Sequence, residues 1–252
     1  MYPILFRFGN FTIYTYGFFV AAAFVAAIFY LSYLIKKSKE KIISQDDLYS
    51  LFMYMMIFSV IGARLLFVLI NLNEFILSPL DILKMWQGGL VYYGGFIAVV
   101  IFIFIYAKRK KIPLLKLGDF FAPALALGHA VGRIGCFFAG CCYGKESSLP
   151  WSVVFTNKYS SAVLGKSLHP TQLYEAFTNF LLFIFLHFYS KKERKLGMSL
   201  AVYIISYAIL RFIIEFFRDD YRGVQYFGFS ISQIISIFLF MIGVFIIICR
   251  KK

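Results

Sequence analysis

The chain has 252 residues, of which 61% are hydrophobic and only 15% charged. This composition carries more apolar surface than one soluble domain could bury, so it predicts a membrane protein. The formal net charge of +14 does not indicate nucleic acid, because the Lys and Arg residues lie in short clusters between apolar runs. Contact with an anionic lipid bilayer explains the basic excess better.

The apolar runs are long enough to cross a membrane, since a helix needs about 20 residues to span roughly 30 Å of hydrocarbon. Lipid cannot satisfy open backbone groups, so we expect an all-α integral membrane protein with residues 1–252 in a single polytopic domain. The first run is expected to be retained rather than cleaved as a secretion signal, because it is long and the cluster "KKSKEK" follows it. The sequence predicts seven transmembrane helices, over approximately residues 12–35, 48–72, 88–107, 117–136, 172–190, 197–217 and 228–249.

The distribution of basic residues predicts the orientation of this bundle. One set of alternate connections and termini carries 16 Lys and Arg residues, and the other set carries 7. The excess belongs on the cytoplasmic side, so the N-terminus is expected outside and the C-terminus in the cytoplasm. One connection, residues 137–171, is long and rich in Pro, Ser and Gly, and it predicts a small external cap between the fourth and fifth spans.

Three arginines, Arg64, Arg133 and Arg211, lie inside predicted spans. At 1.5 Å per residue each is expected roughly 20–25 Å above the cytoplasmic face, toward the outer leaflet. A buried Arg costs about 2.5–3.5 kcal/mol on insertion scales, so three at one depth predict a shared anionic partner or a water-filled cavity. Snorkelling to the interface is the alternative for any one of them.

Other polar groups and glycines are predicted at the same depth, while the cytoplasmic halves of the spans are almost purely apolar. Glycine lets a ligand approach the backbone, and the fork of a guanidinium fits phosphate oxygens. The residues alone therefore predict a protein that handles an anionic lipid headgroup from the outer leaflet. The groups at this depth include Tyr14, Tyr16, Gly17, Tyr92, Tyr93, Gly94, Gly95, His169, Gln172, Tyr174, Glu175, Glu215 and Arg218.

The segment "GRIGCFFAGCCYG", residues 132–144, resembles the signature of the prolipoprotein diacylglyceryl transferases. Further pieces agree in order along nearly the whole chain: "IYTYG", "IGARLLFV", "GGLVYYGGFIA", "HPTQLYEA" and "YAILRFIIEFFR". The resemblance implies an enzyme that moves the diacylglyceryl group of phosphatidylglycerol onto the cysteine thiol of a prolipoprotein signal sequence and releases glycerol phosphate. It implies a multi-pass protein of the bacterial cytoplasmic (inner) membrane.

The same resemblance implies roles for individual residues. Arg133 and Arg211 match the arginines that the family needs most, and one is expected to bind phosphate while the other supports thiolate formation; which does which is left open. Tyr16, Tyr207 and Glu215 match positions that line the cavity, and Glu215 is expected to orient Arg211 from one helical turn away. The expected substrate-binding residues are Arg64, Gly94, Gly95, Arg133, Gly132, Gly135, His169, Gln172, Glu175, Tyr207, Arg211 and Arg218.

The sequence departs from the family pattern at three positions. Tyr93 stands where many members have histidine, and it is kept as a catalytic candidate although a phenol near pKa 10 is a poor base at neutral pH. The base is then another group, or none is needed. Cys136 replaces the usual asparagine and Cys141 a carboxylate, which we interpret as a cysteine-bearing subtype of the signature.

The sequence offers three alternatives to the transferase: a metal site, a thiol oxidoreductase and a lipid or anion transporter. The C-x4-C-C spacing of Cys136, Cys141 and Cys142 is not a usual zinc or thiol-oxidoreductase pattern, and a structural bridge from Cys136 to one of the other two is favoured over both. A lipid or anion transporter is the stronger alternative, but it would need polar groups in the cytoplasmic halves of the spans. No cofactor or metal is expected, and a cavity formed within one chain favours a monomer.

Overall fold

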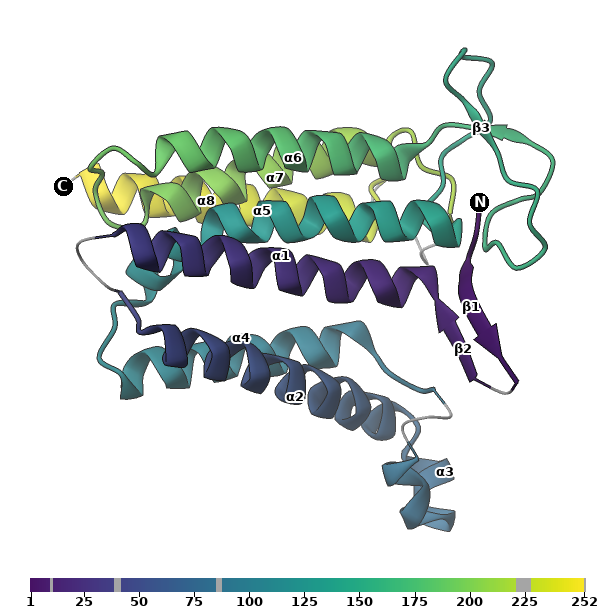
Figure 1. Ribbon diagram of the computed structural model, residues 1–252, viewed down its shortest axis with the longest axis horizontal. Coiled ribbons are helices and arrows are strands. Elements are labelled where there is room, and N and C mark those ends of the chain that lie inside the picture. The colour runs from purple at the N-terminus through teal and green to yellow at the C-terminus, as the bar shows by residue number, and fades with distance from the viewer. Residues whose placement is uncertain (10, 39–41, 85–87, 221–227, 252) are drawn as a thin grey trace. The chain divides into compact units, whose positions relative to one another are not determined.

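The computed structural model describes residues 1–9, 11–38, 42–84, 88–220 and 228–251. The chain divides into two compact units, and each is described by itself: Met1–Leu31 with Gly118–Lys252, and Ser32–Leu117. Helices dominate both units (Figure 1).

The first unit is a helix bundle that begins with a short hairpin. Strands β1 (Ile4–Phe8) and β2 (Phe11–Tyr14) pair antiparallel and lead directly into α1 (Thr15–Lys37). Helix α5 (Leu114–Ala139) runs through the bundle and is followed by α6 (Thr171–Tyr189), α7 (Met198–Glu215) and α8 (Ile231–Lys251). Helix α7 packs against both α6 and α8. Small residues of α5 make close packing possible: the core contains Ala122, Ala126, Leu182, Leu186 and Tyr203.

A carboxylate of α5 fixes the start of α7. Asp119 accepts hydrogen bonds from the backbone N–H groups of Gly197, at 2.6 Å, and Leu200, at 2.9 Å. These donors have no intrahelical partner at a helix N-terminus, so the carboxylate caps α7 from a neighbouring helix. The adjacent Gly118 allows α5 to approach the start of α7, because a Cβ on Gly118 would lie 2.6 Å from Cδ2 of Leu200.

The second unit contains α2 (Gln45–Ile70), α3 (Leu72–Leu77), the 3₁₀ helix η1 (Pro79–Leu83) and α4 (Tyr92–Arg109). Ser44 caps α2 by accepting a hydrogen bond from Asp47 N–H at 3.0 Å. Helices α2 and α4 meet through glycines, since a Cβ on Gly94 would lie 2.3 Å from the carbonyl oxygen of Gly62. Their backbones therefore approach more closely than any side chain would permit.

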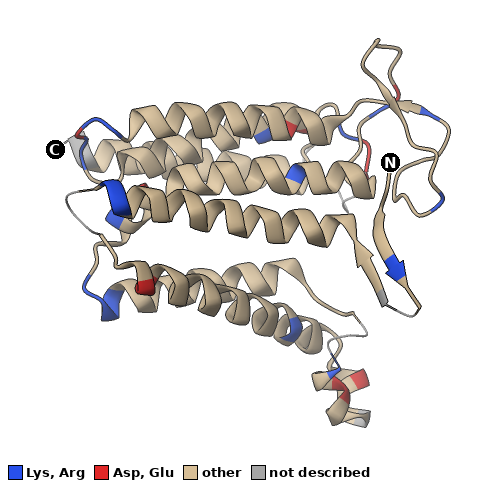
Figure 2. Ribbon diagram, viewed as in Figure 1, with Lys and Arg blue, Asp and Glu red and all other residues tan. Residues whose placement is uncertain are grey.

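Among the residues that the structure describes, six helices are long and apolar enough to cross a membrane: α1, α2, α4, α5, α7 and α8. Each overlaps one of the predicted spans, which confirms an integral membrane protein built from helices. The predicted fifth span, 172–190, corresponds to α6, whose 19 residues include the buried polar residues Thr171, Gln172, Glu175 and Asn179. Figure 2 shows that charged residues are sparse along the helix bodies, while basic residues end α1 and α4.

Two small sheets depart from the all-α prediction. The hairpin β1–β2 is closed by a hydrogen bond from Thr15 N–H to Pro3 O at 2.9 Å, and Gly9 in its turn has φ +55°. The segment predicted as a cap contains β3 (Val153–Val154) paired antiparallel with β4 (Ser167–Leu168). Residues 137–171 also form a small core of their own around Phe155, Ala162 and Leu168.

Candidate active site

Glu175 of α6 stands at the centre of a buried ion-pair network. Its Oε1 accepts hydrogen bonds from Nη1 of Arg211 and Nη1 of Arg218, both at 3.0 Å. Its Oε2 lies 2.6 Å from Nε of Arg133. The Glu175 side chain is only 2% exposed, so one carboxylate holds together arginines from α5, from α7 and from the residues just after α7.

Two further carboxylates complete the network. Glu215 Oε2 lies 2.8 Å from Nη2 of Arg211, one turn away on α7. Asp220 accepts hydrogen bonds from Arg218 through both of its oxygens, at 2.9 Å from Nε and 2.8 Å from Nη2. Three guanidinium groups are therefore balanced by three carboxylates. Such balance is required, because an unpaired buried charge is strongly destabilising.

Serines at the start of α8 support the same network. Ser232 Oγ accepts a hydrogen bond from Nη2 of Arg211 at 3.0 Å, and Ser230 Oγ donates to Oε1 of Glu215 at 2.8 Å. These serines were not singled out from the sequence. The packing of α8 against α7 brings both serines next to Arg211 and Glu215, and no local sequence pattern predicts this contact between helices.

Arg133 differs from the other two arginines. Its side chain is 20% exposed, against 7% for Arg211 and 3% for Arg218. Only its Nε is engaged, and neither Nη1 nor Nη2 donates to any residue that the structure describes. Beside it, a Cβ on Gly132 would meet no atom within 4 Å. Arg133 is thus partly exposed and keeps two amino groups without a partner among the described residues, an arrangement that suits bidentate binding of an anion.

His129, one turn before Arg133 on α5, belongs to an aromatic cluster with two tyrosines of α7. His129 lies against Tyr207, with ring centroids 4.9 Å apart, and its Nδ1 is 3.2 Å from the hydroxyl of Tyr203. Tyr16 on α1 is 46% exposed. Gly135 serves packing, because a Cβ there would lie 2.8 Å from Cβ of Phe19. The substrate roles expected for Tyr16, Tyr207 and Gly135 stay predictions.

The cap segment is fastened to the ion-pair network. Gln172 Nε2 donates to Cys141 O at 2.7 Å, and Thr171 Oγ1 donates to Cys142 O at 2.6 Å, one turn before Glu175. On the other side, Lys145 N–H donates to Phe217 O at 2.8 Å, next to Arg218. His169 belongs to the cap as well, since its Nδ1 lies 3.1 Å from the hydroxyl of Tyr174.

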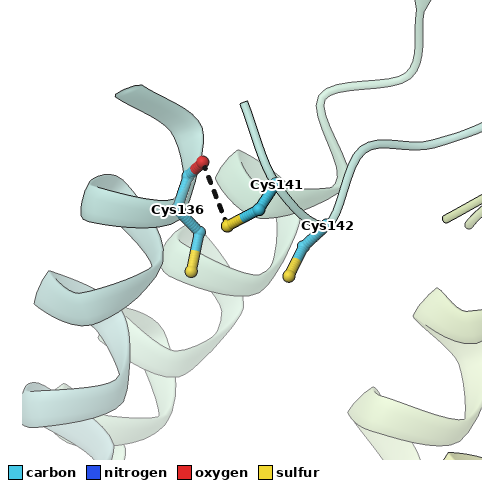
Figure 3. Close-up of side chains that lie close together, drawn as sticks. All are labelled: Cys136, Cys141 and Cys142. Atoms are coloured by element: carbon cyan, nitrogen blue, oxygen red, sulfur yellow. Dashed lines mark hydrogen bonds between the residues drawn. The ribbon is translucent and has the colours of Figure 1, made fainter. Parts of the chain in front are cut away.

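All four cysteines lie in the described part of the chain and none forms a disulfide, so the expected bridge from Cys136 is not formed. The Sγ atoms of Cys136, Cys141 and Cys142 nevertheless lie within 4.8 Å of one another (Figure 3). Hydrogen bonds from the other two thiols hold the pKa of Cys142 below its ordinary value, and the positive charges of Arg218 and Arg133 act in the same direction. The end of α5 therefore carries a cluster of three thiols beside two arginines.

Four of the predicted site residues lie in the second unit. Arg64 donates to the backbone oxygens of Ile82, Gly88, Gly89 and Asp81 at 2.5–3.2 Å, which leaves one N–H of its guanidinium for another partner. Gly94 and Gly95 pack α4 against α2, and Tyr93 is 52% exposed. The substrate roles expected for these four residues stay predictions.

The second unit also contains a cavity of about 220 Å³ beside the Arg64 side chain. Its lining residues are Arg64, Phe67, Glu74, Phe75, Asp81, Gly88 and Gly89.

The fold and the site together define a multi-pass membrane protein with a buried arginine–carboxylate network. Its sequence matches the family described as prolipoprotein diacylglyceryl transferase over residues 3–249. The chain belongs to that family.

Individual relatives match over almost their whole length. The chain is 39% identical to a phosphatidylglycerol–prolipoprotein diacylglyceryl transferase of Clostridium tetani, over 98% of this chain and 96% of the relative. It is 33% identical to a second transferase of that name from Clostridium perfringens, over 92% and 89%. It is 31% identical to one from Geobacter sulfurreducens, over 99% and 96%.

Proposed function

We propose that this protein transfers the diacylglyceryl group of phosphatidylglycerol to the lipobox cysteine thiol of prolipoproteins. Family membership and the names of the relatives support the reaction. The observation that carries it within the site is Arg133, whose side chain is 20% exposed and whose Nη1 and Nη2 donate to no residue that the structure describes. Arg133 and Arg211 were expected to divide phosphate binding and thiolate support between them, and we assign phosphate binding to Arg133.

The chemistry requires that negative charge be stabilised on a leaving phosphate. The acceptor thiol loses its proton, and the thiolate attacks the glycerol carbon that bears the phosphate oxygen. A C–S bond forms, the C–O bond breaks, and glycerol phosphate departs with one additional negative charge. Fixed donors aimed at that charge lower the barrier, and the Nη groups of Arg133 are such donors.

Glu175 and Arg211 act by positioning in this proposal. Glu175 forms an ion pair with Nε of Arg133 at 2.6 Å, which holds the guanidinium beside the carboxylate. Arg211 is held by Glu175, Glu215 and Ser232, so it keeps Glu175 in place and its charge lowers the cost of thiolate formation nearby.

We infer that α6 is a seventh span, with the N-terminus outside and the C-terminus in the cytoplasm of a bacterium. The polar residues of α6 do not contradict this, because Gln172, Glu175 and Asn179 are buried against the bundle rather than exposed to lipid. The basic ends of α1 and α4 are consistent with the cytoplasmic side. A monomer in the cytoplasmic membrane is the simplest assembly.

The reaction is tested by its small product. The purified protein is reconstituted in phosphatidylglycerol vesicles, a lipobox peptide is added, and released glycerol phosphate is quantified. We expect release in proportion to the peptide consumed and none when peptide is omitted. A lipid or anion transporter would move lipid or phosphate between leaflets without producing glycerol phosphate, and that result would overturn the proposal.

A further inference from the structure

The signature loop brings three thiols together at the end of α5. Cys136 occupies the last turn of the helix and is 8% exposed, while Cys141 and Cys142 follow in the turn beyond it. The three Sγ atoms lie within 4.8 Å of one another, and all three belong to the same continuous stretch of chain. Figure 3 shows the sulfur atoms of Cys141 and Cys142 on the side of the turn that faces Cys136.

These separations suit a thiophilic metal ion. A tetrahedral Zn²⁺ bound at about 2.3 Å from each thiolate places its sulfur ligands roughly 3.8 Å apart. The observed separations require only small side-chain movements to reach that value. Three protein ligands leave the fourth position to water or to another incoming ligand.

The backbone already holds the turn in the shape that brings the sulfurs together. Gly140 and Cys142 both have positive φ, +76° and +64°. A Cβ at Gly140 would lie 1.9 Å from Oγ of Ser160, so the cap segment closes tightly over this turn. Thr171 and Gln172 hold the carbonyl groups of Cys142 and Cys141. These hydrogen bonds fix the backbone at two of the three cysteines.

Two arginines of the ion-pair network lie beside such a site. Three thiolates with one divalent cation carry a net charge of −1, which needs a positive neighbour in a buried setting. Arg218 and Arg133 lie close enough to Cys142 to act on it electrostatically. Cys141 and Cys142 are partly exposed, which leaves the ion a route of entry.

We propose that Cys136, Cys141 and Cys142 form a three-thiolate binding site for a thiophilic metal ion of the Zn²⁺ class. The site is joined through Thr171 and Gln172 to the helix that carries Glu175. The spacing C-x4-C-C gave no reason to expect it, because the three sulfurs meet only when the turn at Gly140 reverses the chain.

Metal binding is measured directly on the full-length protein. The protein is purified in detergent under reducing conditions, stripped with a chelator, loaded with Zn²⁺ and desalted, and zinc is counted by elemental analysis. We expect one Zn²⁺ per chain. Replacing Cys136, Cys141 or Cys142 singly by serine should weaken zinc binding by at least about tenfold. Cys249→Ser is the matched control, because Cys249 lies exposed in α8, and it should bind as the unaltered chain does.

A second measurement needs no variant. Loading the unaltered protein with Cd²⁺ should give the ultraviolet charge-transfer band of cadmium thiolates, with an intensity that corresponds to three sulfurs. Absence of zinc and of this band in reduced protein would overturn the proposal. A stoichiometric disulfide from Cys136 to Cys141 or Cys142, found by peptide mapping of protein purified from cells without reductant, would overturn it as well.

Discussion

At the residue scale, the site depends on one carboxylate that serves three arginines. Spacing alone indicated that Glu215 would face Arg211, and the two side chains lie 2.8 Å apart. The same reasoning could not reveal that Glu175 grips Arg211, because the two residues are 36 positions apart on different helices. Sequence patterns report contacts within a helix, whereas this network is built between helices.

Arg133→Lys should lose most of the transfer activity. A lysine retains one positive charge but cannot keep Nε on Glu175 while offering two further nitrogens to a phosphate. We expect kcat to fall by about 100-fold, the scale associated with loss of one oxyanion-stabilising donor. Turnover is measured with a lipobox peptide, and thermal unfolding shows whether the variant is folded. Near-normal turnover would remove Arg133 from the phosphate-binding role.

Glu175→Gln should destabilise the fold. The amide leaves Arg211 and Arg218 with one carboxylate fewer in a buried setting, and breaking a buried ion pair costs about 3–5 kcal/mol. Thermal or denaturant unfolding in detergent measures the loss. Glu193→Gln is the matched control, because Glu193 is exposed in the connection between α6 and α7. Equal stability of the two variants would show that Glu175 does not hold the network together.

At the scale of elements, hydropathy predicted the helices closely. The run 172–190 was expected as a helix, and α6 covers Thr171–Tyr189. Hydropathy did not predict the hairpin β1–β2. The apolar character of the chain continues without a break from Tyr14, the last residue of β2, to Thr15, the first residue of α1. Gly94 also packs α4 against α2, a role that the sequence did not indicate, because glycine serves close helix packing as readily as ligand approach.

Gly94→Ala should separate α2 from α4. A Cβ would lie 2.3 Å from Gly62 O and 2.5 Å from Cβ of Leu66, so both backbones must move. Overpacking of this kind costs about 1–3 kcal/mol, measurable as a lower midpoint of thermal unfolding. Gly128→Ala on α5 is the control, because a Cβ there meets no atom within 4 Å. Unchanged stability of Gly94→Ala would contradict the packing role.

At the scale of the whole molecule, composition and charge indicated a multi-pass membrane protein before any motif was considered. The long connection 137–171 was expected to form a cap, and it folds around its own small core. The attachment of this cap beside Arg218 could not be predicted from the sequence. It depends on a close approach between Gly144 and Phe217, where a Cβ on Gly144 would lie 2.6 Å from the carbonyl oxygen of Phe217. Such contacts arise only when distant segments meet.

The proposed orientation predicts which connections are reachable from outside the cell. In a background with all four native cysteines replaced by serine, Ser148→Cys in the cap should react with a membrane-impermeant maleimide in intact cells. Ser190→Cys, just after α6, should react only after the membrane is permeabilised. Both positions are exposed in the structure. Labelling of Ser190→Cys in intact cells would contradict the orientation and the assignment of α6 as a span.

The most direct test of the proposed activity is the mass of the acceptor. A lipobox peptide and the same peptide with its cysteine replaced by serine are incubated with the purified protein in phosphatidylglycerol vesicles and analysed by mass spectrometry. The cysteine peptide should gain the mass of one diacylglyceryl group, and the serine peptide should gain none. An unchanged cysteine peptide, under conditions where a characterised relative modifies it, would contradict the assignment of this protein as a diacylglyceryl transferase.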